Sequence, residues 1–560
     1  MRNTFLVILS VLFFNCSLHA QDKCPSTKRV TVVGGGIIGA LESYYAYKEG
    51  QNQGSKIIIN VYEKGESFDV SPHEENGKAS TNTSYNIVPS LTIDEILSVV
   101  PRGEEMVRKL SIPFSEPGGI RVDDVEGVND SKSALQFKEA VTAYGSDPGH
   151  EDRTDTLLRL GRKSMDLWQS LYDEADLELK AILEASNFNP CREQKDAVIH
   201  LHDGYRIDLI YGIREAEKQA LSMKESYEKF GYKNCKLLTP KEVISIDPFL
   251  TDYCVCHSSN NKWNEDSAAL WRPGGCIDTK VFLPLFYDYL KKTMGCYVED
   301  SIEKNCFSLN FGKEVIAVEL GARDGNFLIM GLTFKDGEKH CDKDSEYVFC
   351  SGEAVGTLEK LGFSEPAYAG FAGVSLMLNI PLNASQEEAW KNFSHCMEVH
   401  NEGVVLAWQA RRIKNSLFIG VAGTKAFYGD KIPHKDEAFA RNRNLVQLNM
   451  INQVIPEALS LALGFDTKEM TLKEEHLLSL EEASFARRWA GRRSLAYDGF
   501  PTFGFLYANN KRVDNARCTT HLGSGGVSFA PASVYASRQA KASHKEEFIE
   551  KVLHYSDSRR

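Results

Sequence analysis

The sequence predicts an α/β protein that combines a Rossmann-type nucleotide-binding domain with a second domain of the α+β type. A short β-branched segment at residues 29–33 runs into a glycine-rich turn, and an apolar helix is expected from Ile37 to about Lys48. A second strand at 57–62 completes a strand–helix–strand unit. After this unit helical and strand-like segments mix without an internal repeat, and 560 residues exceed what one small core needs.

Later segments give the α+β character. Residues 151–184 form a helical pattern in which five side chains fall near one face: Leu157, Leu160, Ser164, Trp168 and Leu171. A second long helix is expected at 437–463, and strands at 404–408 and 416–421.

Composition excludes one class of function. Apolar residues make up 42% of the chain and charged residues 25%, and the formal net charge is −12. A nucleic-acid-binding protein needs a basic face that neutralises phosphates, and the sequence has no basic stripe with interleaved aromatic residues. We therefore expect no nucleic-acid partner.

The first twenty residues resemble a signal peptide in their pattern. Arg2 precedes an apolar run from Phe5 to Phe14, and a small polar stretch ends at Ala20. This predicts a signal peptide at 1–20 and an exported protein, in the periplasm, secreted or in an endomembrane lumen. A buried N-terminal strand and an uncleaved anchor stay open. The run is too short to span a bilayer, and no other run is longer, so we expect no stable transmembrane insertion.

Cleavage of this segment would leave twelve of the 13 cysteines. Cys254 and Cys256 flank one residue, so both would point to the same face of a strand there. The C-x-C spacing occurs without a second cysteine couple or paired histidines, and we expect no metal site. We expect most of the cysteines to be small buried apolar residues.

The glycine turn carries a dinucleotide-binding pattern. Gly34, Gly36 and Gly39 have the G-x-G-x-x-G spacing: the first allows a tight turn, the second lets a pyrophosphate approach the backbone, and the third lets the helix pack on the sheet. The helix N-terminus offers N–H groups to phosphates. Glu63 ends the second strand, where its carboxylate can accept ribose hydroxyls. We also expect three neighbours to line this site: Ile37, Ile38 and Lys64. The pattern alone does not choose between NAD and FAD.

Three further segments decide the cofactor through a resemblance. They read ASTNTSYNIVP (Ala79–Pro89), WAGRRSLAYDGFPTFG (Trp489–Gly504) and THLGSGGVSFAPAS (Thr520–Ser533). In this order, and over about residues 29 to 540, the chain resembles the FAD-dependent oxidoreductases of the D-amino-acid oxidase and glycine oxidase type. In that family the late segments follow "aGLRPxTxDGxPxxG" and "GHGGxGxxxxPA". Shorter stretches support the order: Leu238–Leu250, Trp271–Leu290 and Tyr347–Val355.

The resemblance implies that the FAD-binding domain is interleaved with an α+β substrate domain that has a mixed or antiparallel sheet. The expected ranges for FAD binding are 24–98, 265–365 and 489–545. The ranges 99–264 and 366–488 would form the substrate domain.

The resemblance also implies further cofactor-binding residues. Ser80 and Thr81 have hydroxyls suited to the pyrophosphate or flavin, and Gly352 would let the backbone pass close to the cofactor. A helix over Val527–Ala540, preceded by glycines, would stabilise negative charge on the reduced flavin; its site residues are Gly523, Gly525, Gly526 and Val527. Ordinary polar loops and turns at these positions stay open. No cysteine lies between Trp489 and Gly504, which favours noncovalent FAD.

Substrate-binding residues follow from the same late motif. Its arginine binds the substrate carboxylate in glycine oxidase-like members, and it corresponds here to Arg493, with Arg492 as the alternative. The chain departs from the family at this point, because Arg492-Arg493-Ser494 replaces Leu-Arg-Pro. Tyr497 and His521 are the other candidates for catalytic groups. His521 could equally cap the glycine turn.

The resemblance implies oxidation of a C–N bond in an amino acid or amine by hydride transfer to flavin N5. Electrons would then pass to oxygen or to a quinone or other carrier. Two alternatives stay open: dehydrogenation of an alcohol or 2-hydroxy acid on the same fold, and a non-catalytic secreted protein that keeps the flavin fold as a binding module.

Overall fold

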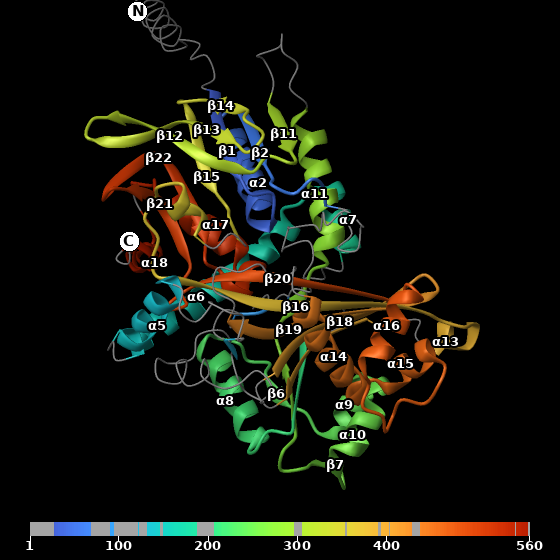
Figure 1. Cartoon of the computed structure of the whole chain (residues 1–560). Coiled ribbons are helices and arrows are strands. Elements are labelled where there is room, and N and C mark those ends of the chain that lie inside the picture. The colour runs from blue at the N-terminus through green and yellow to red at the C-terminus, as the bar shows by residue number, and fades with distance from the viewer. Residues whose placement is uncertain are drawn as a thin grey trace, which may run out of the picture.

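The computed structural model describes residues 27–68, 90–93, 121–122, 132–145, 149–186, 206–295, 305–352, 356–389, 394–401, 404–427, 437–543 and 545–557. The expected signal peptide, Ser80 and Thr81 lie outside these residues. Two large sheets, one above the other in Figure 1, dominate the described structure. We call them the nucleotide sheet and the substrate sheet.

The nucleotide sheet has a parallel centre. Its strands run in the order β11 (Cys306–Asn310), β2 (Lys56–Tyr62), β1 (Thr27–Val33), β15 (Ser345–Phe349), β22 (Lys511–Thr520), β13 (Asn326–Phe334) and β12 (Val315–Arg323). The first five are parallel to their neighbours, whereas β12 and β14 (Lys339–Cys341) pair antiparallel to β13, and β21 (Thr502–Ala508) antiparallel to β22. The predicted strand–helix–strand unit is confirmed, with α2 at Ile37–Asn52.

Helices cover the nucleotide sheet and share its core. They are α2, α6 (His150–Asp173), α7 (Leu177–Ala185), α11 (Thr279–Met294), α17 (Ala530–Gln539) and α18 (Glu547–Asp557). Alternate residues of β2 are buried, namely Ile57, Ile59 and Val61. The five side chains predicted to share a helical face, from Leu157 to Leu171, are all buried. Burial of apolar surface between these layers stabilises the nucleotide half.

The substrate sheet is mixed, as predicted. Its order is β20 (Ala486–Ala496), β16 (Tyr368–Pro381), β19 (Ser416–Phe427), β18 (Val404–Ile413), β17 (Ser394–Asn401), β5 (Arg206–Tyr211), β9 (Ala268–Arg272) and β6 (Lys236–Leu237). Along this path only the β17–β5 pair is parallel, and β4 (Arg121–Val122) adds a parallel pair with β19.

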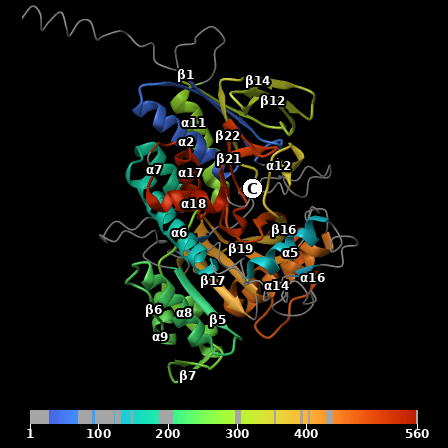
Figure 2. The same ribbon diagram turned by 90° about the vertical axis from the view of Figure 1, so that its left-hand side faces the viewer.

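The two faces of the substrate sheet have different neighbours. One face packs its apolar side chains, such as Leu378, Ile419 and Trp408, against α9 (Pro240–Ile246), α10 (Thr251–Cys256), α14 (Glu437–Val454), α15 (Pro456–Leu463) and α16 (Glu474–Glu482). The other face is turned toward the nucleotide half (Figure 1), and we call it the inner face. In the turned view of Figure 2, α5 (Lys132–Gly145) and α8 (Ala216–Lys229) lie in the lower half of the molecule, which contains the substrate sheet.

Short elements complete the described structure. They are β3 (Ser90–Leu91), which pairs with β10 (Gly275–Cys276), the hairpin of β7 (Ser258–Ser259) and β8 (Lys262–Trp263), α12 (Thr357–Lys360), α13 (Ala384–Ala389), and the 3-10 turns η2 (Pro248–Leu250) and η4 (Gly523–Gly526). No helix of the described residues is long and apolar enough to cross a membrane.

Four sequence expectations need correction. The pattern at 151–184 is two helices, α6 and α7, because Asp176 caps the second with its side chain. The helix at 437–463 is broken before Pro456, which lacks the N–H that an unbroken helix needs. The final helix begins at Ala530 rather than Val527, because the glycines before it form η4.

The fourth correction concerns Cys254 and Cys256. They lie on helix α10 and not on a strand, so Cys254 is buried and Cys256 is exposed. Six of the eight cysteines with described side chains are buried, and all eight are free thiols.

Two strands that were expected in the FAD-binding domain belong to the substrate sheet. Residues 265–272 and 489–496 were expected in the FAD-binding domain, but β9 and β20 pair within the substrate sheet.

Candidate cofactor and substrate site

The predicted cofactor residues gather at one edge of the nucleotide sheet. The glycine turn follows β1, Glu63 follows β2, Gly352 follows β15, and the C-terminal glycines follow β22. These four strands are neighbours and parallel, so their carboxyl ends meet. A crevice outside the carboxyl ends of such strands is where open α/β sheets bind ligands.

Gly34 and Gly39 have the geometry that the motif requires. Gly34 has φ of +110°, and a Cβ there would lie 2.5 Å from the carbonyl oxygen of Cys350. A Cβ on Gly39 would lie 2.0 Å from the carbonyl oxygen of Gly34. Both positions exclude a side chain, because the turn, the helix and β15 pack backbone against backbone.

The N-terminus of α2 lies at this edge of the sheet. Gly36 is its N-cap in an extended conformation, and this N-cap makes no side-chain hydrogen bond. Ile37 and Ile38 are buried in the core, so they contribute backbone N–H groups and packing rather than side-chain contacts to a ligand. The N–H groups at the start of a helix and the helix dipole favour a phosphate at such an end.

Glu63 is held beside this turn. Its Oε2 accepts a hydrogen bond from Gly35 N at 2.7 Å and its Oε1 accepts one from Gly65 N at 3.0 Å. The side chain is buried, whereas the neighbouring Lys64 is exposed. These two backbone donors fix the carboxylate at the end of β2, and a carboxylate is a group that can accept hydrogen bonds from ribose hydroxyls.

The turns after β15 and β22 leave space for a flat ligand. Among the described residues, a Cβ built on Gly352 or on Gly526 would meet no atom within 4 Å, unlike those on Gly34 and Gly39. Beside Gly352, the Oγ of Ser351 is buried and has no hydrogen-bond partner in the part of the chain that the structure describes. An unsatisfied hydroxyl next to open backbone fits the polar edge of a bound nucleotide cofactor. The residues at this edge therefore fit FAD.

The C-terminal glycine turn contacts both the nucleotide half and the substrate sheet. Gly523 has φ of +55°, Gly525 is buried, and the carbonyl of Val527 accepts a hydrogen bond from Trp168 Nε1 at 3.3 Å. Leu522 forms an isolated bridge with Leu495 near the end of β20. This bridge places the glycine turn beside the strand that carries Arg493.

Arg493 lies on the inner face of the substrate sheet. It is opposite Phe371 of β16, and its guanidinium folds back over Gly373, where a Cβ would lie 3.0 Å from Cζ. Arg492 is the next residue of the strand and points to the opposite face. The structure therefore separates the two candidates, and Arg493 is the one directed toward the nucleotide half.

Tyr497 and His521 have different surroundings. Tyr497 follows β20, and its ring packs edge-on against Tyr144 of α5 with centroids 6.0 Å apart. His521 is fully buried in a left-handed conformation, with Nδ1 2.9 Å from Thr502 Oγ1 and Nε2 3.3 Å from Glu365 Oε1. A substrate would have to displace one of these partners to reach His521, so the geometry favours a structural role in the turn.

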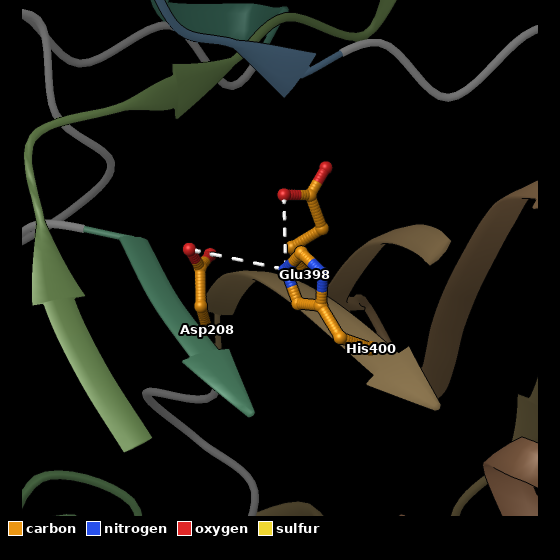
Figure 3. Close-up of side chains that lie close together, drawn as sticks. All are labelled: Asp208, Glu398 and His400. Atoms are coloured by element: carbon orange, nitrogen blue, oxygen red, sulfur yellow. Dashed lines mark ion pairs between the residues drawn. The ribbon is translucent and has the colours of Figure 1, made fainter. Parts of the chain in front are cut away.

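A buried ionic cluster on the inner face was missed in the sequence. Asp208 of β5 and Glu398 and His400 of β17 bring potential metal-ligating atoms within 4.8 Å of one another (Figure 3). His400 Nε2 lies 3.3 Å from Glu398 Oε2 and 4.0 Å from Asp208 Oδ2. Both carboxylates already pair with Arg272: its Nε contacts Asp208, and its Nη2 lies 2.8 Å from Glu398. We interpret the group as an ion-pair network, because the guanidinium occupies the place of a cation.

A second missed network joins the layers of the nucleotide half. Arg517 of β22 is fully buried, and its Nη2 donates to Glu42 Oε2 on α2 at 2.6 Å. Its Nε lies 2.5 Å from Glu346 Oε1 on β15. In the sequence only Glu42 stands out, as a charge within the apolar start of α2, because the segment around Arg517 is largely polar.

Comparisons with solved structures identify the fold. Glycine oxidase from Geobacillus kaustophilus is 13% identical, with 93% of this chain and 96% of that chain covered and a TM-score of 0.51. A fructosyl amine:oxygen oxidoreductase from Aspergillus fumigatus is 11% identical, with 94% and 89% covered and a TM-score of 0.50. Fructosyl peptide oxidase from E. terrenum is 13% identical, with 94% and 92% covered and the same TM-score.

The chain has the fold of these oxidases. No protein-family model and no curated protein matches the sequence. At such low identity the likeness extends to the fold, and the assignment of the site residues depends on the geometry above.

Proposed function

We propose that the protein is an FAD-dependent oxidoreductase that oxidises the C–N bond of an amino acid or amine. One observation carries this proposal: the bridge between Leu495 and Leu522 brings the predicted flavin turn beside β20, whose inner face presents Arg493. A cofactor edge and a carboxylate-binding group thus meet at the boundary between the two halves of an oxidase fold.

In this proposal the strand-end residues hold FAD without a covalent bond. The N-terminus of α2 at Gly36 binds the pyrophosphate, Glu63 accepts ribose hydroxyls, and the turns at Gly352 and Gly523–Gly526 pass along the flavin. Bound FAD supplies the hydride acceptor for the reaction. The protein's own residues then orient the substrate C–H and exclude water.

Arg493 is the residue that orients the substrate. Its planar guanidinium donates two parallel hydrogen bonds to a carboxylate, which fixes the α-carbon of an amino acid relative to the cofactor. Gly373 makes room for this group, because a side chain there would push against Cζ. Tyr497 stands at the end of the same strand and can close one side of the pocket. Oxygen is the proposed electron acceptor, by analogy with the oxidases of the same fold.

Export belongs to the same proposal, on the basis of the apolar run before Ala20. N-terminal sequencing of native protein should then find a mature end near Gln21. An intact Met1 in a cytosolic fraction would contradict it.

The first experiment is a substrate screen with the purified protein. It should be yellow, denaturation should release FAD, and anaerobic addition of one amino acid or amine should bleach it. A colourless protein that does not take up FAD would refute the proposal, and flavin that stays on the denatured chain would refute noncovalent binding.

Arg493→Ala tests the substrate-binding role. Loss of a buried carboxylate partner costs about 2–5 kcal/mol, so kcat/KM should fall by roughly 30-fold to several thousand-fold. Arg493→Lys should recover only part of it, because lysine lacks the fork. Arg492→Ala on the opposite face is the matched control, and FAD content should be unchanged in all three. Wild-type kcat/KM for Arg493→Ala on a carboxylate substrate would exclude this role.

A further inference from the structure

Helix α11 directs a tyrosine toward the cofactor edge of the nucleotide sheet. The helix ends beside the start of β11, where Phe307 N donates to the carbonyl oxygen of Gly295 at 3.2 Å. Its first turn therefore lies toward the carboxyl ends of β11 and of β2, which are parallel. Long side chains of a helix point toward the helix N-terminus. The ring of Tyr287 is thus directed toward the edge where Glu63 and the glycine turn lie.

Two phenylalanines hold this ring in place. Phe307 of β11 stacks on the ring of Tyr287 with centroids 6.0 Å apart and an angle of 29° between the planes. Phe68, in the segment after Glu63, stacks on it with centroids 5.8 Å apart and an angle of 18°. Both phenylalanines are buried, so close packing restricts the ring. The apolar body of Tyr287 is therefore fixed between β11 and the segment that follows β2.

The hydroxyl of Tyr287 has a different environment from its ring. Tyr287 is only 3% exposed, and its Oη has no hydrogen-bond partner in the part of the chain that the structure describes. Tyr289 on the same helix shows the ordinary arrangement, because its hydroxyl donates to Asp176 Oδ2 at 2.8 Å. A buried hydroxyl without a partner costs free energy, and native proteins complete such a group with a ligand or an ordered water.

The charged groups near this phenol belong to the cofactor edge. Burial, and then repulsion from Glu63 and Cys350, raise the pKa of Tyr287 well above its usual range. The phenol therefore stays protonated and can donate a hydrogen bond. Glu63 and Cys350 flank the glycine turn: Gly35 N donates to Glu63 Oε2 at 2.7 Å, and a Cβ on Gly34 would lie 2.5 Å from the carbonyl oxygen of Cys350.

We propose that Tyr287 binds the AMP moiety of the cofactor, with its hydroxyl donating to a ribose or phosphate oxygen beside Glu63. The carboxylate of Glu63 only accepts hydrogen bonds, whereas Tyr287 adds a side-chain donor to the same edge. A ribose hydroxyl can donate to Glu63 and accept from Tyr287, so the two side chains are complementary. This inference rests on the proposed function, because it requires a bound dinucleotide.

The test titrates the apoprotein of the full chain with AMP and with FAD, in wild type, Tyr287→Phe and Tyr289→Phe. Phenylalanine keeps the ring and its stacking and removes only the oxygen. Loss of one hydrogen bond weakens binding by roughly 3- to 10-fold. Tyr287→Phe should therefore bind AMP and FAD more weakly by this factor. Tyr289→Phe is the matched control on the same helix and should bind both as wild type does.

The melting temperature of the apoprotein separates ligand binding from a structural role. Tyr287 Oη has no partner among the described residues, so its removal should leave this temperature unchanged or raise it. Tyr289→Phe loses the hydrogen bond to Asp176 and should melt at a lower temperature. Added AMP should raise the melting temperature of Tyr287→Phe less than that of wild type.

Three results would overturn the role of Tyr287 and leave the proposed oxidation in place. The first is an unchanged affinity of Tyr287→Phe for AMP and FAD. The second is weaker binding of FAD with unchanged binding of AMP, which would place the hydroxyl against the flavin half. The third is a lower melting temperature of the Tyr287→Phe apoprotein, which would assign the hydroxyl to the structure of the protein itself. An apoprotein that binds neither AMP nor FAD would instead refute the proposed function, and this inference with it.

Discussion

Replacing Arg517 by methionine would remove the cation that joins β22, β15 and α2. In the native protein Glu42 and Arg517 are both fully buried, and Nη1 of Arg517 also donates to Ser537 Oγ at 3.0 Å. The variant keeps most of the side-chain volume but removes the guanidinium from both carboxylates, which leaves Glu42 with Arg538 at 3.4 Å and Glu346 with Lys541 at 3.1 Å. We therefore expect a loss of stability dominated by uncompensated charge rather than by a cavity.

The magnitude follows from Glu346. Burial alone would raise its pKa, but Arg517, with smaller contributions from Lys541 and Lys28, lowers the pKa of Glu346 from 4.5 to about 2, so the figure that follows is an upper value for Arg517. At about 1.4 kcal/mol per pKa unit this corresponds to about 3 kcal/mol, in line with the 3–5 kcal/mol typical of breaking a buried pair. Since the folded pKa is below the unfolded one, this stability is present above about pH 4.5 and is lost as the pH falls toward 2.

The assay is urea unfolding followed by circular dichroism at pH 7 and at pH 4, with refolding checked at each pH. Arg517→Met should unfold at lower urea than wild type at pH 7, and the difference should shrink at pH 4. Arg512→Met is the control: it breaks an exposed pair with Asp514 on the same strand and should cost at most about 1 kcal/mol. Equal midpoints for the two variants at pH 7 would refute the reasoning.

Two further predictions concern the cofactor turn and the cluster of the substrate sheet. Gly36→Val should abolish FAD binding while the apoprotein stays folded, because a side chain at the N-cap of α2 would stand where the pyrophosphate approaches. Titration of the apoprotein with FAD measures this, and an unchanged affinity would place the dinucleotide elsewhere. Arg272→Met should destabilise the protein by about 3–5 kcal/mol, because Asp208 and Glu398 lose their shared partner. Arg412→Met, which breaks a half-exposed pair between Arg412 of β18 and Glu387 of α13, should cost at most about 1 kcal/mol; a similar urea midpoint for both would contradict the prediction.

Local signals explain what the sequence predicted well. The glycine turn, α2 and Glu63 lie within about forty residues, and the spacing of Gly34, Gly36 and Gly39 has a direct backbone meaning. The alternation of a strand also separates Arg493 from Arg492 once β20 is identified.

The buried ion-pair networks could not be predicted, because they depend on contacts between segments that are distant in the sequence. Glu42 and Arg517 are 475 residues apart, so no spacing rule joins them. Asp208 and Glu398 meet only because β5 pairs with β17. For His521 the sequence left catalysis and capping of the glycine turn equally open, and the contacts of its ring with Thr502 and Glu365, which are distant in sequence, favour the second.

The strand order of the nucleotide sheet has a consequence for synthesis of the chain. Strand β1 begins at Thr27, but β22, which separates β15 from β13, ends at Thr520. While the ribosome is still translating the intervening residues, β15 and β13 each have an edge without its final neighbour, and Glu346 has no arginine beside it. Unpaired edges of this kind template aggregation. The nucleotide sheet therefore stays open at its centre until β22 has emerged and paired with β15 and β13.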